Sequence, residues 1–179
     1  MNNFKLLINE LKHNTSFQRK FLLGLSGAIF GIIITYIYYP KIHYRIGLID
    51  TPSIYEKIVI YELKKPDEVI KNKMYVFKFP YSTKYYKKGE LFIKYAKCLP
   101  GDKLEVRGYK YYCNGKYFAT AVKTDSKGEP VKHFEYNGTI PQNKYFMYAP
   151  HPQSYDSRYW GFLDKKEIIG VVKWHLMDW

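Results

Sequence analysis

The sequence predicts a mainly β fold that follows a single N-terminal membrane helix. Residues 21–39, FLLGLSGAIFGIIITYIYY, contain no charged side chain. From residue 41 onward, short segments rich in Val, Ile, Tyr and Phe alternate with Gly, Pro and Asn, a pattern typical of strands joined by turns. The 179 residues suffice for one domain with a substantial core and an appendage. We therefore expect three parts, which are residues 1–20, a helix over 21–39 and a β-rich domain over 41–179.

The apolar run over 21–39 is long enough to cross a bilayer. As a helix, its nineteen residues rise roughly 28 Å, close to the thickness of the hydrocarbon layer. Tyr36, Tyr38 and Tyr39 at its end are suited to the headgroup boundary. A cleaved signal peptide is the alternative, because basic residues precede the run. However, the run is longer than such peptides use and no small-residue cleavage site follows it, so the sequence favours an uncleaved anchor.

The charges that flank this helix indicate its orientation. Residues 1–20 hold four basic side chains and one acidic side chain, a net charge of +3, and basic segments favour the cytoplasmic side. Lys41 and Arg45 beyond the other end weaken the contrast. We expect a single-pass protein of the inner (cytoplasmic) membrane, with residues 1–20 in the cytoplasm and residues 41–179 on the extracytoplasmic (periplasmic) side.

Eight strands are expected in the β-rich part, at 56–63, 74–79, 91–98, 103–107, 109–113, 116–122, 144–149 and 168–174. Asn114-Gly115 is the strongest hairpin signal in the chain. Residues 123–143 are rich in Gly, Pro, Asn and Asp, which indicates a long excursion with little regular structure. The segments MYVFKF (74–79) and WHLMDW (174–179) are candidates for dipping into the membrane interface, although an ordinary half-buried strand is the favoured interpretation of the first.

Cys98 and Cys113 each lie in an expected strand, with a turn around Gly108 between them. In an oxidising compartment they would form one disulfide, and two buried free thiols are the alternative. Their spacing does not match a zinc site, and the five histidines are scattered along the chain. The sequence has no Gly-rich phosphate loop. We therefore expect no metal and no cofactor.

The net charge of +13 favours contact with an anionic surface, either nucleic acid or lipid headgroups. Basic residues mixed with aromatics occur at Lys64-Lys65 and in KYYKK (84–88). Such stretches bind nucleic acid by phosphate contact and stacking, or lie on anionic lipid. Because they follow a membrane helix, we assign them to the lipid bilayer and expect no nucleic acid partner.

Three short segments carry the candidate chemistry. In FIKYAKCLPGD (92–102) a strand lysine is followed by Pro-Gly-Asp, and SYDSRYWG (154–161) is a dense cluster of polar residues. DTPSIY (50–55) places a serine shortly after the membrane helix. Over about residues 21–175 this arrangement resembles the type I signal peptidases, whose serine, lysine box and C-terminal box these segments match. The Thr-x-Ser form and DSKGEP (125–130) make the resemblance closest to the conjugative-transfer (TraF-type) signal peptidases.

The resemblance implies a signal-peptidase-like β catalytic domain in which Ser53 is the nucleophile and Lys94 the general base, a Ser-Lys dyad. A lysine ammonium, with a pKa near 10.4, is almost wholly protonated at neutral pH, so it has to be stripped of water to act as a base. Three apolar residues are expected around it: Phe92, Ala96 and Leu99. Without the flanking boxes Lys94 would be interpreted as a solvated strand lysine. Lys97 should lie on the opposite strand face, in solvent.

The resemblance also implies the supporting residues. Thr51 and the backbone N–H of Ser53 correspond to the family's oxyanion hole, in which each donor is worth roughly 3 kcal/mol in the transition state. Ser154 matches the serine that orients the lysine. Asp156 and Arg158 match a buried pair that holds this segment in place, and a surface ion pair worth under about 1 kcal/mol is the alternative.

The sequence departs from the family directly after the serine, where residues 54–57 replace the usual Met and Pro. Two functions therefore stay open. The first is a membrane-bound serine endopeptidase that cleaves signal peptides or precursors of exported, conjugative-transfer (pilin-like) proteins after small residues. Its acyl-enzyme would be resolved by water or by the substrate's own amine. The second is a non-catalytic, membrane-anchored binding protein of a secretion or transfer apparatus. A DNA-associated protein of the LexA type is not favoured, because a hydrophobic span precedes the domain instead of a helix-turn-helix.

Overall fold

The computed structural model describes residues 15–38, 43–49, 53–54 and 56–178. The chain divides into two compact units, Met1–His43 and Tyr44–Trp179, and each is described by itself. The predicted mainly β fold with one N-terminal apolar helix is confirmed. The predicted cytoplasmic segment 1–20 lies largely outside the described residues, and the membrane topology stays a prediction.

The first unit contains one long helix, α2 (Thr15–Tyr38), which is long and apolar enough to cross a membrane. None of its side chains is buried, as expected of an element that does not pack into a protein core. The helix begins at Thr15 rather than at residue 21, because Arg19 and Lys20 are good helix formers and extend it ahead of the apolar run. Residue 39, the predicted end of the anchor, lies outside the described residues.

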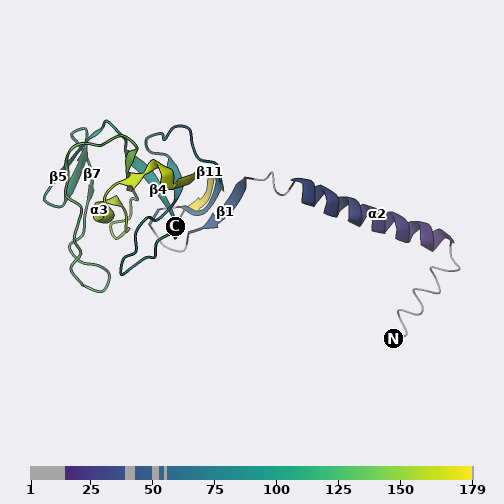
Figure 1. Ribbon diagram of the computed structural model, residues 1–179. Helices are drawn as coiled ribbons and strands as arrows, with labels where there is room; N and C mark the ends of the chain where they lie inside the picture. Colours follow the sequence, from purple (N-terminus) through teal and green to yellow (C-terminus); the bar gives the residue numbers. More distant parts are fainter. Residues whose placement is uncertain (1–14, 39–42, 50–52, 55, 179) are drawn as a thin grey trace. The chain divides into compact units, whose positions relative to one another are not determined.

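The second unit is built from antiparallel strands in two sheets (Figure 1). The seven-stranded sheet has the order β1 (Tyr44–Leu48), β2 (Glu56–Glu62), β11 (Ile168–Asp178), β3 (Met74–Lys78), β4 (Leu91–Cys98), β9 (Lys144–Tyr148) and β10 (Leu163–Asp164). The four-stranded sheet has the order β7 (Lys116–Thr120), β6 (Lys110–Cys113), β5 (Lys103–Arg107) and β8 (Asn137–Thr139). A short helix, α3 (Ser157–Trp160), and a 3₁₀ turn, η2 (Lys165–Glu167), complete this unit.

All eight predicted strands form, and three further strands were not predicted. These are β1, β8 and β10, of which β8 falls inside the predicted excursion over 123–143. β1 is an edge strand with mostly exposed side chains, and β8 and β10 contain three and two residues. Segments so short or so exposed have no local hydrophobic period, and they become strands only by pairing with β2, β5 and β9.

The hairpin between β6 and β7 forms at the predicted Asn114-Gly115 turn. Both residues have positive φ, 51° and 77°, which is the backbone that a two-residue hairpin turn requires. The segment 74–78 forms the strand β3, as favoured, but it is more than half-buried, because Met74, Tyr75, Val76 and Phe77 are all buried. The segment 74–79 is therefore a core strand rather than a segment that dips into a membrane.

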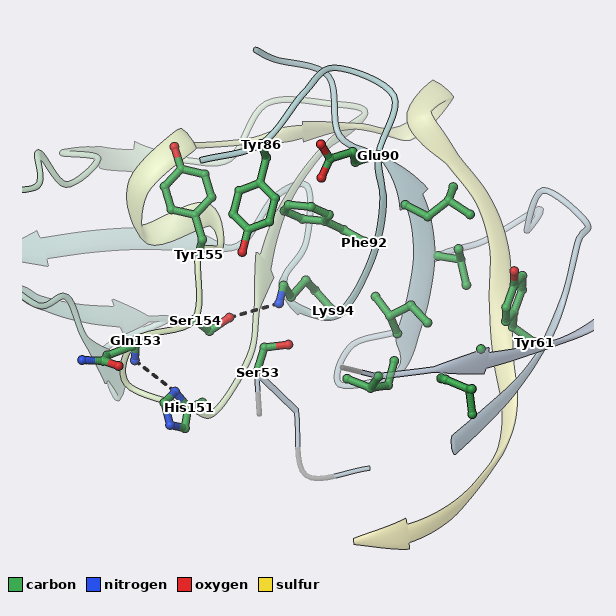
Figure 2. A pocket seen from close by; sticks show the side chains of 16 residues that line it. Ser53, Tyr61, Tyr86, Glu90, Phe92, Lys94, His151, Gln153, Ser154 and Tyr155 are labelled. Atoms are coloured by element: carbon green, nitrogen blue, oxygen red, sulfur yellow. Dashed lines mark hydrogen bonds between the residues drawn. The ribbon is translucent and has the colours of Figure 1, made fainter. Parts of the chain in front are cut away.

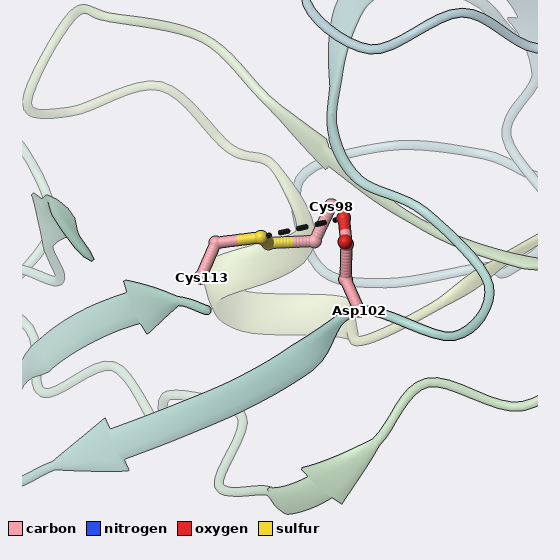
Figure 3. Close-up of side chains that lie close together, drawn as sticks. All are labelled: Cys98, Asp102 and Cys113. Carbon is pink, nitrogen blue, oxygen red and sulfur yellow. Dashed lines mark hydrogen bonds between the residues drawn. A yellow bond between two sulfur atoms is a disulfide. The ribbon is translucent and has the colours of Figure 1, made fainter. Parts of the chain in front are cut away.

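Cys98 and Cys113 form a disulfide that joins the end of β4 to β6 in the other sheet (Figure 3). Of the two alternatives left by the sequence, the bonded one is present. The carboxylate of Asp102 lies beside the sulfurs, where it accepts hydrogen bonds from Lys71, Asn114 and the backbone N–H of Leu99. Sulfurs joined in a disulfide do not supply the thiolates that a metal ion would need as ligands. Asp102 therefore serves here to connect Lys71, Asn114 and Leu99 through its hydrogen bonds.

We predict that replacing both cysteines by alanine lowers the free energy of unfolding of the β domain by about 3 kcal/mol. The bond closes a loop with a sequence separation of 15 residues, and losing it frees the unfolded chain. Urea unfolding of the full chain in detergent, with and without reductant, measures the effect. Reductant should move the midpoint of the parent to that of the double variant and leave the variant unchanged. Equal midpoints for the oxidised parent and the variant would contradict the prediction.

Candidate active site

The candidate site is a cavity of about 480 Å³ that Ser53, Lys94 and Ser154 share. Its walls come from the end of β1, the first half of β4, the loop before β4 and the loop after β9. Figure 2 shows the three side chains converging on one place in this cavity. Segments that are far apart in the sequence thus bring together a hydroxyl, an amine and a second hydroxyl.

Lys94 lies at the centre of β4 on the strand face that points into the core. Its side chain is buried with only 6% of its surface exposed, and its Nζ donates a hydrogen bond to Ser154 Oγ at 3.1 Å. The Phe92 ring centre lies 5.7 Å from Nζ. Burial lowers the pKa of Lys94 to about 8, while the charge of Asp156 opposes this shift and that of Arg158 adds to it. At pH 7 roughly one tenth of this amine is therefore uncharged.

The neighbours of Lys94 follow the alternation of the strand. Phe92 and Ala96 lie on the same buried face of β4, and Leu99 packs against the same core cluster. Lys97 lies on the opposite face, as predicted, but it is half-buried and its Nζ donates to Asn72 Oδ1 at 3.3 Å. The expectation that Lys97 is simply solvated is therefore wrong in part, because Asn72 and its surroundings cover it.

Ser53 is half-buried at the wall of the cavity. Its backbone carbonyl accepts a hydrogen bond from the backbone N–H of His151 at 3.4 Å, so the serine loop is held against the loop that carries Ser154. His151 also lines the cavity, and its Nδ1 accepts from the backbone N–H of Gln153. Thr51, the predicted oxyanion-hole residue, lies outside the described residues, so its role stays a prediction.

The atypical residues after Ser53 serve packing. Ile54 is fully buried in a small core cluster, and Glu56 is buried with its Oε1 accepting from the Tyr95 hydroxyl at 2.7 Å. Tyr55 lies outside the described residues. The departures at Ile54 and Glu56 therefore concern how this loop is fixed to the sheet.

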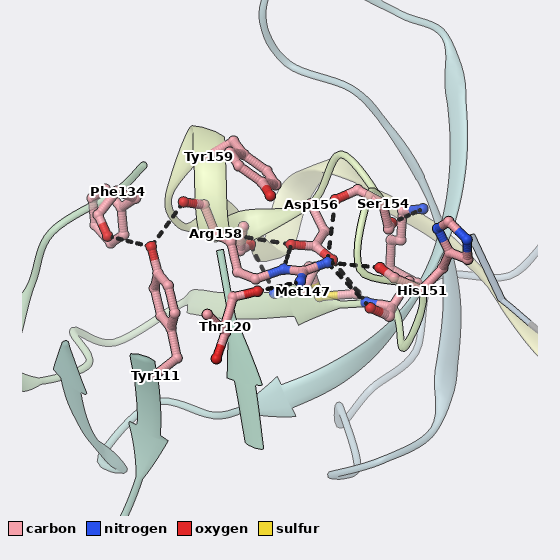
Figure 4. Close-up of polar contacts among 12 residues, drawn as sticks. Tyr111, Thr120, Phe134, Met147, His151, Ser154, Asp156, Arg158 and Tyr159 are labelled. Atoms are coloured by element: carbon pink, nitrogen blue, oxygen red, sulfur yellow. Dashed lines mark hydrogen bonds and ion pairs between the residues drawn. The ribbon is translucent and has the colours of Figure 1, made fainter. Parts of the chain in front are cut away.

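Asp156 and Arg158 form a buried ion pair behind Ser154 (Figure 4). Their side chains are 0% and 2% exposed, and two parallel bonds of 2.8 Å join Arg158 Nε and Nη2 to the two carboxylate oxygens. Arg158 also donates to four backbone carbonyls: Thr120, Ala149, His151 and Ser154. The alternative of a surface pair is wrong. The pair connects the second sheet to the loop that presents Ser154.

Several residues around the cavity have no local signal in the sequence. They come from the loop before β4 and the loop after β9: Tyr86, Glu90 and Gln153. The stretch 84–88 was assigned to lipid headgroups, yet Tyr86 is half-buried and packs on Phe92. An aromatic residue inside a basic loop was the only hint, and a solvated loop has the same composition.

Comparisons with known proteins identify the family of this chain. The model of the family described as signal peptidase, peptidase S26, matches residues 21–177. Signal peptidase I P of Bacillus subtilis subsp. natto is 29% identical over 133 residues, which are 64% of this chain and 72% of that protein. A crystal structure of a signal peptidase I from Enterococcus faecalis V583 is 25% identical, with a TM-score of 0.41, and covers 63% of this chain and 100% of its own. The family model spans most of the chain, from the apolar helix to the last strand, and the chain belongs to the peptidase S26 family of signal peptidases.

Proposed function

We propose that this protein is a membrane-anchored serine endopeptidase in which Ser53 and Lys94 form a catalytic dyad that cleaves signal peptides from exported precursors. The observation that carries the proposal is the buried Lys94 amine, held by Ser154 in the cavity that Ser53 also lines. Burial of a lysine at the wall of a cavity lowers its pKa, so that its amine can act as a base near neutral pH.

In the proposed reaction Ser53 Oγ attacks the scissile carbonyl while the neutral Lys94 amine takes the hydroxyl proton. The resulting oxyanion is stabilised by the backbone N–H of Ser53 and the hydroxyl of Thr51. The ammonium of Lys94 then protonates the leaving amine, which leaves an acyl-enzyme on Ser53. Lys94, again neutral, activates a water molecule that releases the acid product. The bond to Ser154 keeps Nζ in one position through both steps.

The substrate would be a precursor with small residues near the cut, presented beside the membrane by the α2 anchor. Precursors of a conjugative-transfer apparatus, such as pilin-like proteins, are the narrower proposal, supported by Thr51-x-Ser53 and by DSKGEP at 125–130. In that branch the substrate's own amine replaces water in the last step. The Cys98–Cys113 disulfide supports a catalytic domain on the oxidising, extracytoplasmic side of the inner membrane.

We predict that kcat/KM for precursor cleavage rises with pH and levels off above a midpoint near 8. The neutral amine is the reactive form, and burial lowers the pKa of Lys94 to about 8, so roughly one tenth of the enzyme is competent at pH 7. The measurement uses detergent-solubilised full-length protein and a precursor with small residues before the cut, with the product's new N-terminus identified by mass spectrometry.

Two outcomes would contradict this proposal. Cleavage that is constant between pH 6 and pH 9 would remove Lys94 as the group that titrates. A precursor that binds but stays intact at every pH would favour the alternative, a non-catalytic membrane-anchored binding protein of a secretion or transfer apparatus.

A further inference from the structure

Two loops meet beside the cavity and are joined by side chains that the proposed reaction does not use. The first, residues 79–90, connects β3 to β4 and is called the β3–β4 loop. The second, residues 121–136, connects β7 to β8 and is called the β7–β8 loop. Lys84 Nζ lies 2.6 Å from Glu129 Oε2 and 3.4 Å from Asp125 Oδ2, and the Tyr85 hydroxyl donates to the same Asp125 oxygen at 2.7 Å.

The other carboxylate oxygen of Asp125, Oδ1, holds this residue within the β7–β8 loop. Its Oδ1 accepts from the backbone N–H groups of Lys127 and Glu129, both at 2.9 Å, and its own N–H donates to the Glu129 carbonyl at 2.8 Å. The hydrogen bond from Tyr85, followed by these backbone bonds, lowers the pKa of Asp125 to about 2. One charged carboxylate therefore fixes its own loop with one oxygen and holds the β3–β4 loop with the other.

The same part of the β3–β4 loop packs on Phe92, whose ring lies near the amine of Lys94. Tyr86, adjacent to Tyr85, packs its ring edge-on against Phe92 at 4.8 Å and stacks on Tyr155 at 5.4 Å. Figure 2 shows the Tyr86 ring over the cavity, next to Phe92 and on the side where Lys94 and Ser154 meet. Contacts thus run without a break from Asp125, through the β3–β4 loop and Phe92, to Lys94.

We infer that Asp125 is a positioning residue, which ties the β3–β4 loop down so that Tyr86 and Phe92 exclude water from the Lys94 amine. The consequence for catalysis rests on the proposed function, whereas the consequence for the amine does not. Loss of the contacts of Asp125 with Lys84 and Tyr85 would let water reach the Lys94 amine, and a hydrated amine favours its charged form.

The groups near Lys94 make this inference testable through its titration. Two charges act on it directly, those of Asp156 and Arg158. The other titratable side chains that line the cavity are Tyr61, Tyr86, Glu90, His151 and Tyr155. Substitutions at Asp125, Lys84 or Tyr85 remove none of these groups. A change in the pKa of Lys94 would then report water access above the amine.

The test removes the contacts of Asp125 with Lys84 and Tyr85 by substitutions in either loop. Asp125→Asn removes the charge and keeps the size of the side chain, while Lys84→Met with Tyr85→Phe removes both partners and leaves the β7–β8 loop unchanged. Glu135→Gln is the matched control, an acid-to-amide change in the same loop at a side chain that is 79% exposed. The pKa of Lys94 is followed in the full-length protein by NMR of ¹³Cε-labelled lysine, assigned with Lys94→Met. Amide hydrogen exchange of residues 80–90 is measured alongside.

Asp125→Asn and the double variant are both expected to raise the pKa of Lys94 by about one unit and to speed amide exchange in the β3–β4 loop. The higher pKa would lower kcat/KM about tenfold at pH 7, and raising the pH would restore it. Glu135→Gln should match the parent, and Asp125→Glu should recover part of the loss. An unchanged pKa of Lys94 in both Asp125→Asn and the double variant would overturn the inference, whatever the activity. A pKa that responds in a protein without peptidase activity would support the inference and refute the proposed function.

Discussion

Replacing Lys94 by Met is expected to lower kcat/KM for precursor cleavage by about 10³ to 10⁴-fold, and Ser53→Ala by at least as much. Methionine keeps the length and apolar contacts of the buried chain but cannot take a proton. Because nucleophile and base act in one step, the double variant should be no slower than the slower single variant. Rates are measured by mass spectrometry of the cleaved precursor, with the full-length proteins in detergent.

Lys97→Met is the matched control, because Lys97 lies three residues along the same strand on its opposite face. This variant should cleave at the parental rate. Lys94→Met should also keep or increase the thermal stability of the parent, since it removes an amine whose burial costs free energy. Loss of activity is therefore expected without loss of folding. A Lys94→Met protein that cleaves within tenfold of the parent would exclude Lys94 as the base.

Replacing Arg158 by Met is expected to destabilise the β domain by about 3 to 5 kcal/mol. The substitution leaves the Asp156 carboxylate, 0% exposed, without its charged partner. It also removes the donor that serves the carbonyls of His151 and Ser154. Urea unfolding followed by tryptophan fluorescence measures the change in free energy.

The double variant Asp156→Ala with Arg158→Met should be more stable than Arg158→Met alone, because no uncompensated charge remains in the core. Arg107→Met is the control at the surface, where Arg107 is 66% exposed and pairs with Glu105, and it should cost under about 1 kcal/mol. The Asp156 carboxylate also accepts hydrogen bonds from the backbone N–H groups of Ala149 and Arg158. A double variant less stable than Arg158→Met would show that Asp156 acts mainly through these two bonds and not through the ion pair.

Much of the fold follows from local patterns. The apolar run, the eight strands and the Asn114-Gly115 hairpin were predictable because hydrophobic period and turn chemistry act over a few residues. The segments around Lys94 and Ser154 were identified differently, through their resemblance to the lysine box and the C-terminal box of the type I signal peptidases. Strands β1, β8 and β10 were missed because their only reason to be extended is a partner strand distant in sequence.

By itself, the sequence determined the class of fold, the long apolar helix and the segments that match the lysine box and the C-terminal box. It left three properties to the tertiary structure: the burial of Lys94, its bond to a serine 60 positions away and the joining of Cys98 to Cys113. Each depends on which strands become neighbours, since the pairing of β4 with β9 places the loop that carries Ser154 beside Lys94. A lysine in an alternating strand has the same sequence pattern in water and in a core. Only the residues that the fold packs over it decide whether its pKa stays ordinary or falls far enough to make it a base.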